Sequence, residues 1–186
     1  MKASSSKPRR RVLGAGKYIR LVQEGRWEYA ERVVASGAVA IVAVTKAREL
    51  VLVEQNRVPV GGPTIELPAG LVGDIPGESV ADWGEIARRE LLEETGFQAR
   101  QMTRLMFGPM SAGFSSESVA LYLARGLTRV HDGGGIDHEE IRVHVVPLAR
   151  VENWLKRKGR AGLHIDQKIF AGLYFAGQLS LSARRR

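Results

Sequence analysis

Three glutamates stand close together near the middle of this 186-residue chain. Glu90, Glu93 and Glu94 are spaced i, i+3 and i+4, so in a helix their carboxylates share one face. Like charges at this spacing repel, and a stable helix needs solvent, a nearby arginine or divalent cations to offset the repulsion. The chain has no cysteine, so a metal held here would have oxygen or imidazole ligands, which favours a hard cation such as Mg²⁺. Taken alone, such a triplet is usually a solvated helix face.

The residues around the triplet favour the metal. Residues 89–97 read RELLEETGF, which fits the pattern R-E-U-x-E-E-x-G-U with U aliphatic or aromatic, and residues 66–70 read ELPAG. At average residue frequencies, the nine-residue pattern arises by chance in such a chain on the order of once in 10⁵. The pattern resembles the core of the Nudix box.

The resemblance continues outside this box, from about Trp27 to Gly177, and points to the ADP-ribose pyrophosphatase and NDP-sugar hydrolase branch of the Nudix family. The similar segments are WEYAERVVASGAVAIVAV, LVEQNRVPVGGPTIELPAGLV, SAGFSSE and GGGIDHEEIRVHVVPL. The resemblance implies cleavage of the pyrophosphate of ADP-ribose or a nucleoside diphosphate sugar to a nucleoside monophosphate and a sugar phosphate. It also implies a cofactor, Mg²⁺, with Mn²⁺ able to replace it.

The resemblance assigns roles in metal binding. The ligands would be Glu90, Glu94 and the carbonyl of Ala69, with Glu93 bridging or in reserve. Arg89 would orient the glutamates instead of touching substrate. Carboxylates with a carbonyl suit Mg²⁺, which takes oxygen ligands and keeps some of its waters.

The catalytic carboxylate is less narrowly defined. The matching branch carries it in an acidic loop that here reads DHEE, so Asp137, Glu139 and Glu140 are all candidates. Glu139 is our prediction, because alternation along the next strand puts it on the side of Ile141 if that side faces the core. The glycines at 133–135 would let this loop close over substrate, or would simply be flexible.

Four further residues are expected to contact substrate. Arg57 matches a substrate-binding arginine of the branch and would pair with phosphate oxygens, and Arg32 is a weaker candidate for the same role. Trp27, which alternates with Tyr29, would stack on the nucleobase, and Glu117 would lie at the mouth of the site. The ordinary alternatives are surface ion pairs for the arginines and simple packing for the aromatic pair.

The upstream half of the box departs from the usual spacing. Eighteen residues separate Gly70 from Arg89 instead of thirteen. The extra residues precede the glutamate cluster, so the metal face survives. Glu78 and Glu85 are both candidates for the upstream box glutamate.

Strands and helices that could position these residues follow from the hydrophobic pattern. The expected strands are 26–45, 50–58, a short strand before the Gly- and Pro-rich loop at 68–79, 102–110, 118–124 and 141–146, and the expected helices are 80–94 (closed by Gly96), 148–158 and 165–181. The first two strands make a plausible antiparallel pair. This order predicts an α/β protein, an α/β/α sandwich around a mixed sheet, and the resemblance implies the Nudix version of it.

Charge and composition bear on partners and location. The net charge of +8 equals the eight basic residues near the two ends, so the rest of the chain is formally neutral. We therefore expect a disordered basic tail at 1–12, one domain at 13–182 and a basic tail at 183–186, with nucleic acid an unlikely partner. No stretch suits a membrane span or a secretory signal, which favours a cytoplasmic protein.

The resemblance also implies a homodimer, in which the partner subunit often supplies the base-stacking aromatics. Two other functions remain open. The same box could remove pyrophosphate from RNA 5′ ends, which would give the basic tails a purpose. A Nudix module that senses a ligand without cleaving it is disfavoured, because every carboxylate of the box core is present.

Overall fold

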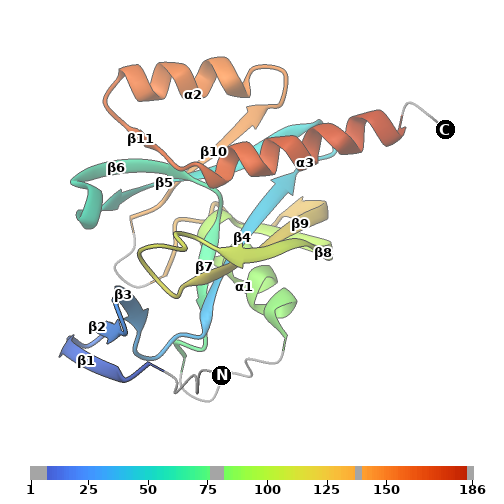
Figure 1. Cartoon of the computed structure of the whole chain (residues 1–186). Helices are drawn as coiled ribbons and strands as arrows, with labels where there is room; N and C mark the ends of the chain where they lie inside the picture. Colours follow the sequence, from blue (N-terminus) through green and yellow to red (C-terminus); the bar gives the residue numbers. More distant parts are fainter. Residues whose placement is uncertain (1–7, 76–81, 137–139, 184–186) are drawn as a thin grey trace.

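The strand β4 (Gly37–Val44) runs through the middle of the protein and is buried on both faces. The computed structural model describes residues 8–75, 82–136 and 140–183, with β4 near its centre (Figure 1). Alternate residues of β4 belong to two separate hydrophobic cores. Val39 and Ile41 belong to one core, while Ala40 and Val42 belong to the other. The continuous apolar run of β4 therefore reflects a sheet covered on both sides.

A mixed sheet is built around β4. Its strand order is β11-β6-β5-β4-β9-β8, with β10 added beside β5 and β7 beside β4. The other strands are β5 (Glu49–Arg57), β6 (Gly62–Glu66), β7 (Ala69–Val72), β8 (Phe97–Pro109), β9 (Ser118–Arg129), β10 (Arg142–Pro147) and β11 (His164–Ile165). Neighbours β4 and β9 are parallel, while β4 and β5 form the predicted antiparallel pair.

Helices cover the two faces of this sheet (Figure 1). The helix α1 (Trp83–Thr95) contributes Ile86 and Leu91 to one core. On the other face, α2 (Val151–Arg160) and α3 (Lys168–Ala183) contribute Leu155 and Ile169. The predicted α/β/α sandwich around a mixed sheet is confirmed.

The ends of α1 follow ordinary capping chemistry. The side chain of Asp82 accepts hydrogen bonds from the backbone N–H groups of Gly84 and Glu85, and Gly96 closes the helix with a φ of 71°. The closing role predicted for Gly96 is confirmed. The predicted start at residue 80 lies outside the described residues.

The N-terminal part forms a second, three-stranded sheet. Its strands are β1 (Arg10–Ala15), β2 (Ile19–Glu24) and β3 (Trp27–Arg32). The expected single strand at 26–45 is wrong, because β3 ends at Arg32 and β4 begins only at Gly37. A side chain on Gly37 would crowd the carbonyl of Ser118, so only glycine fits there.

The predicted basic tail at 1–12 overlaps β1, which begins at Arg10. Residues 10–12 pair with β2, and Arg10 forms an ion pair with Glu31 of β3. Within the described residues, no helix is both long and apolar enough to cross a membrane.

Candidate active site

A cavity of about 450 Å³ opens between α1, the end of β5 and the start of α3. Glu90 and Glu94 of α1 line one part of it. Its basic lining residues are Arg32, Arg57 and Lys168. The helical spacing of the glutamates therefore places two of the three carboxylates at a cavity that is also lined by three basic side chains.

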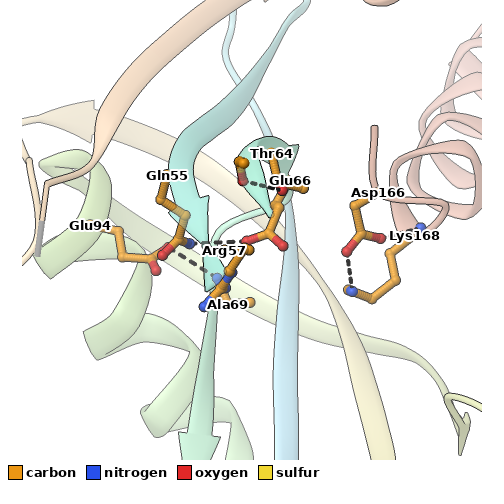
Figure 2. Close-up of polar contacts among 9 residues, drawn as sticks. Gln55, Arg57, Thr64, Glu66, Ala69, Glu94, Asp166 and Lys168 are labelled. Atoms are coloured by element: carbon orange, nitrogen blue, oxygen red, sulfur yellow. Dashed lines mark hydrogen bonds and ion pairs between the residues drawn. The ribbon is translucent and has the colours of Figure 1, made fainter. Parts of the chain in front are cut away.

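Two backbone contacts bring the start of β7 against these carboxylates. The N–H of Ala69 donates a hydrogen bond of 3.0 Å to the carboxylate of Glu94, whose residue is only 4% exposed (Figure 2). At the next position, a Cβ on Gly70 would overlap the carboxyl group of Glu90. The glycine of ELPAG is therefore required because the backbone passes directly over a carboxylate.

The guanidinium of Arg89 offsets the repulsion among the glutamates. One terminal nitrogen lies 2.8 Å from the Glu93 carboxylate and the other lies 2.9 Å from that of Glu90. Among the described residues, Glu93 is not part of the cavity lining. This geometry fits the orienting role expected of Arg89 and leaves Glu93 in reserve.

Oxygen donors at the cavity fit a hard divalent cation. No three acidic or histidine side chains in the described ranges already converge as a metal cage. Mg²⁺ does not need such a cage, because it is commonly bound through one or two carboxylates while keeping several waters. Glu90 and Glu94 supply two carboxylates, and the backbone of Ala69 lies beside Glu94. The residues present therefore fit the expected metal.

Arg57, which the resemblance predicts to bind a phosphate, is the last residue of β5. Its Nε and one terminal nitrogen donate hydrogen bonds of 2.9 and 2.6 Å to Glu66 (Figure 2). Gln55 donates a third bond, of 3.0 Å, to the same oxygen. Burial alone would lower the pKa of Arg57, but the carboxylate of Glu66 outweighs it and the pKa is raised. Arg57 therefore stays charged at the cavity wall.

Arg32 and Glu117, predicted separately as substrate-binding residues, form an ion pair with each other. They are 85 residues apart in the chain, and both line the cavity. A backbone contact between the N–H of Ala30 and the carbonyl of Phe114 holds the two segments together.

The sequence did not predict the polar lining residues Gln55, Asp74 and Lys168. Lys168 lines the cavity, and its ammonium group is paired with the carboxylate of Asp166. Both lie where β11 leads into α3, and this segment reaches the cavity because β11 pairs in parallel with β6. The polar D-Q-K before an apolar run is a helix-start signal, but nothing in it indicates a cavity.

Trp27 does not lie at this cavity. It lines a separate hollow of about 330 Å³ with Tyr29, and it is 54% exposed. The hydroxyl of Tyr29 donates a hydrogen bond of 3.2 Å to the carboxylate of Glu24. Within one chain, the aromatic pair is thus apart from the carboxylates of α1.

The acidic loop is described only in part. Asp137 and Glu139 lie outside the described residues, as does Glu78. Glu140 lines a different hollow beside Glu54 and Arg142. The other candidate for the upstream box position, Glu85, is mostly exposed and pairs with Arg88 of its own helix.

The glycines before that loop pack against the C-terminal end of α1. The N–H groups of Gly134 and Gly135 donate hydrogen bonds of 2.9 and 3.2 Å to the carbonyls of Glu94 and Glu93. These carbonyls have no partner within the helix, so the loop completes its end. A Cβ on Gly133 would lie 2.6 Å from the Glu94 carbonyl oxygen. The glycine run, which precedes the acidic loop in the sequence, is therefore fastened to the glutamate-bearing helix.

Comparison with known proteins agrees with this geometry. The model of the NUDIX domain matches residues 35–165. The chain is 34% identical to the ADP-ribose pyrophosphatase of Bacillus subtilis (strain 168) over 80% of its own length and 77% of that protein. It is 39% identical to the methanol dehydrogenase activator of Bacillus methanolicus, but the match spans only 56% of this chain and 54% of that protein.

Two further matches are more distant. The GDP-mannose pyrophosphatase of Escherichia coli (strain K12) is 29% identical over 65% of this chain and 64% of that protein. A solved structure of an ADP compounds hydrolase superposes with a TM-score of 0.68 over 96% of each chain at 23% identity, which shows a shared fold. The family model covers more than half of the sequence, and the chain belongs to the Nudix family.

Proposed function

We propose that this Nudix protein hydrolyses the pyrophosphate of ADP-ribose or a related nucleoside diphosphate sugar, with Mg²⁺ as its cofactor and Mn²⁺ able to replace it. One observation carries the proposal: a single cavity holds the carboxylates of Glu90 and Glu94 together with the cations of Arg32, Arg57 and Lys168. The carboxylates suit a divalent cation, and the cations suit a diphosphate. The names of the pyrophosphatase relatives support the same substrate class.

Each group has a part in the proposed reaction. Pyrophosphate resists bare water because its anionic oxygens repel a nucleophile. Held by Glu90, Glu94 and the Ala69 carbonyl, the metal would neutralise phosphate charge and lower the pKa of a bound water. Arg57 would hold a phosphate through its guanidinium, and Arg89 would keep Glu90 oriented.

The proton acceptor in this proposal is Glu139, with Asp137 and Glu140 as the alternatives. Support comes from the glycine run at 133–135, which precedes the acidic loop in the sequence and is fastened to the end of α1. A carboxylate carried a few residues beyond that run is within the reach of a short loop from Glu93 and Glu94. The acceptor would then take the proton of the attacking water.

We further propose a homodimer, in which Trp27 of one subunit stacks on the nucleobase held by the other. The three-stranded N-terminal sheet supports this proposal, because it exposes large apolar side chains. They are Val12, Leu13, Ile19, Leu21 and Trp27. Apolar residues gathered on one small sheet are typical of a protein interface. The cytoplasmic location stays a prediction.

A substrate panel tests the reaction. ADP-ribose, ADP-glucose, GDP-mannose and 5′-triphosphorylated RNA are incubated separately with the protein and Mg²⁺, and the products are separated by chromatography, with EDTA as the control. The proposal predicts nucleoside monophosphate and sugar phosphate from at least one nucleotide sugar, and no product with EDTA. Pyrophosphate released from RNA alone would instead support the RNA 5′ pyrophosphohydrolase, and binding without turnover would support a sensing module.

A further inference from the structure

A second pocket, of about 500 Å³, lies beside the active-site cavity. The two share Arg57 and Met110 in their linings, so they meet at the end of β5. The second pocket is formed by the 3₁₀ turn η1 (Val58–Val60), β6 and the segment that leads from β11 into α3. Apart from the shared Arg57, no residue that lines this pocket has a part in the reaction proposed above.

Two ion pairs separate the pocket from the cavity. In one, Arg57 faces both spaces while its partner Glu66 lines only the pocket. In the other, Lys168 lines the cavity while Asp166 lines the pocket. Figure 2 shows the two pairs apart from each other, with a dashed line joining the carboxylate of Asp166 to the ammonium group of Lys168. Of these four side chains, Lys168 therefore lines the cavity alone, Glu66 and Asp166 line the pocket alone, and Arg57 lines both.

This distribution of charge indicates which chemical group belongs on each side. Among the described residues, Arg57 is the one lysine or arginine that lines the pocket, so the carboxylates of Glu66 and Asp166 disfavour a diphosphate there. The cavity is also lined by carboxylates, but it adds Arg32 and Lys168, and a divalent cation would neutralise Glu90 and Glu94.

Carboxylates accept hydrogen bonds from hydroxyl groups, and a sugar ring carries several of these. The remaining wall of the pocket includes Val60 and Ile165, which offer apolar surface to the C–H face of a ring. A polyhydroxylated ring therefore fits the pocket better than a phosphate does.

Both acids are held firmly. Glu66 is only 8% exposed and accepts three hydrogen bonds from Arg57 and Gln55. Asp166 is fixed through its backbone N–H, which donates a hydrogen bond of 2.9 Å to the carbonyl of Ile65. Its side chain also accepts a hydrogen bond of 2.7 Å from the N–H of Lys168. Hydrogen-bond acceptors that are already fixed lose little conformational entropy when a ligand binds. Such acceptors favour a ligand whose hydroxyl groups match their positions.

We propose that this second pocket binds the sugar of the nucleotide sugar, with Glu66 and Asp166 accepting hydrogen bonds from its hydroxyl groups and Val60 packing on its ring. The inference rests on the proposed function, since it assigns the sugar half of that substrate. It makes Val60 and Asp166 residues that determine specificity.

The chain offers a matched pair of variants. Val58 and Val60 lie in the same 3₁₀ turn and are both exposed, at 82% and 53%, but only Val60 lines the pocket. Val60→Trp would fill the pocket, whereas Val58→Trp would add the same side chain outside it. Because both positions are at the surface, neither substitution disturbs the core.

The experiment compares ADP-ribose with methyl-ADP, which has the same pyrophosphate but a methyl group in place of the sugar. Steady-state kinetics measure kcat/KM for both compounds, and calorimetry measures the affinity for ADP-ribose. The inference predicts that Val60→Trp lowers kcat/KM for ADP-ribose by about tenfold or more, the effect of roughly 1.4 kcal/mol, while methyl-ADP is unaffected. Val58→Trp should change neither.

An equal loss on both compounds, or no loss on either, would overturn the inference. If the substrate panel selects another nucleotide sugar, that compound and its methyl nucleotide replace ADP-ribose and methyl-ADP. If the wild-type protein cleaves no nucleotide sugar of the panel, the proposed function fails, and calorimetry then decides the inference separately. ADP-ribose binding that is weakened by Val60→Trp and not by Val58→Trp would still assign the sugar to this pocket. Equal binding by all three proteins, or no binding by the wild type, would overturn it.

Discussion

The backbone N–H of Ala69 donates a hydrogen bond of 3.0 Å to the carboxylate of Glu94, and this contact joins two segments that lie 25 residues apart. It fixes the start of β7 against the face of α1 that carries the glutamates. One residue later, Gly70 passes so close to Glu90 that no side chain fits between them. The two halves of the sequence motif, ELPAG and RELLEETGF, are thus in direct contact.

Gly70→Ala should therefore impair metal binding. The added methyl group overlaps the Glu90 carboxyl group and must displace it. We expect the Mg²⁺ concentration that gives half-maximal activity to rise by about tenfold or more, as for the loss of one ligand interaction. Gly108→Ala is the control, since a Cβ there meets nothing within 4 Å. An unchanged Mg²⁺ titration for Gly70→Ala would show that Glu90 has no part in metal binding.

Arg57→Lys should weaken substrate binding even though the charge is kept. A lysine cannot make the two parallel hydrogen bonds that a guanidinium offers to a phosphate. The expected result is a rise in KM for ADP-ribose of about tenfold with a smaller change in kcat. Steady-state kinetics at saturating Mg²⁺ measure both constants. If the lysine variant matches the wild type in KM, the role of Arg57 is limited to its ion pair with Glu66.

Gly133→Ala should destabilise the folded protein. Gly133 has a φ of 75°, and an added Cβ would lie 2.6 Å from the Glu94 carbonyl oxygen. We expect a loss of about 3 kcal/mol in the free energy of unfolding, from the left-handed conformation and the clash together. Gly162→Ala has the conformational cost without the clash, since nothing lies within 4 Å there, and should lose about 1 kcal/mol. Urea unfolding measures the free energy of unfolding of both variants. Equal losses for Gly133→Ala and Gly162→Ala would mean that the packing of Gly133 does not contribute to stability.

His144 gives the stability a defined dependence on pH. Its ring nitrogen Nε2 lies 2.8 Å from Glu54, which also accepts a hydrogen bond from Lys158. Burial lowers the pKa of His144, and the hydrogen bond to Glu54 compensates only in part. Below the ordinary pKa of about 6.5, the unfolded chain therefore binds a proton more readily than the folded one, and stability falls as pH falls.

Replacing His144 by Gln should flatten this dependence. The free energy of unfolding of the wild type should decrease between pH 7.5 and 5.5 by more than that of the variant, with a difference in slope of at most about 1.4 kcal/mol per pH unit. Denaturant titrations at several pH values give both slopes. Parallel slopes would mean that His144 titrates in the folded protein as it does in the unfolded chain.

Local chemistry made much of the fold predictable. The Val/Ala/Ile run of β4 is typical of a strand buried on both faces, and alternate residues such as Val39 and Ala40 belong to opposite cores. The glutamate spacing and Gly96 together defined α1, because helix periodicity and capping act within a few residues.

Contacts between residues far apart in the sequence could not be predicted. The ion pair of Arg32 with Glu117 joins residues 85 apart, and no local pattern indicates such a partner. Lys168 reaches the cavity only because two residues of β11 pair in parallel with β6. The strand at Arg10 depends in the same way on pairing with β2 and on an ion pair with Glu31 of β3. Polar residues at such positions look like solvated surface until the tertiary structure brings them together.

The most direct test of the proposed reaction is the rate of ADP-ribose hydrolysis by Glu94→Gln. Glutamine keeps an oxygen that can accept the Ala69 N–H but removes the negative charge, so the fold is preserved while a metal ligand is weakened. With saturating Mg²⁺, we predict that the wild type forms AMP and ribose 5-phosphate and that the variant is slower by at least about a hundredfold. Glu152→Gln, an exposed change on α2, should match the wild type. A Glu94→Gln variant that hydrolyses ADP-ribose at the wild-type rate would contradict the account.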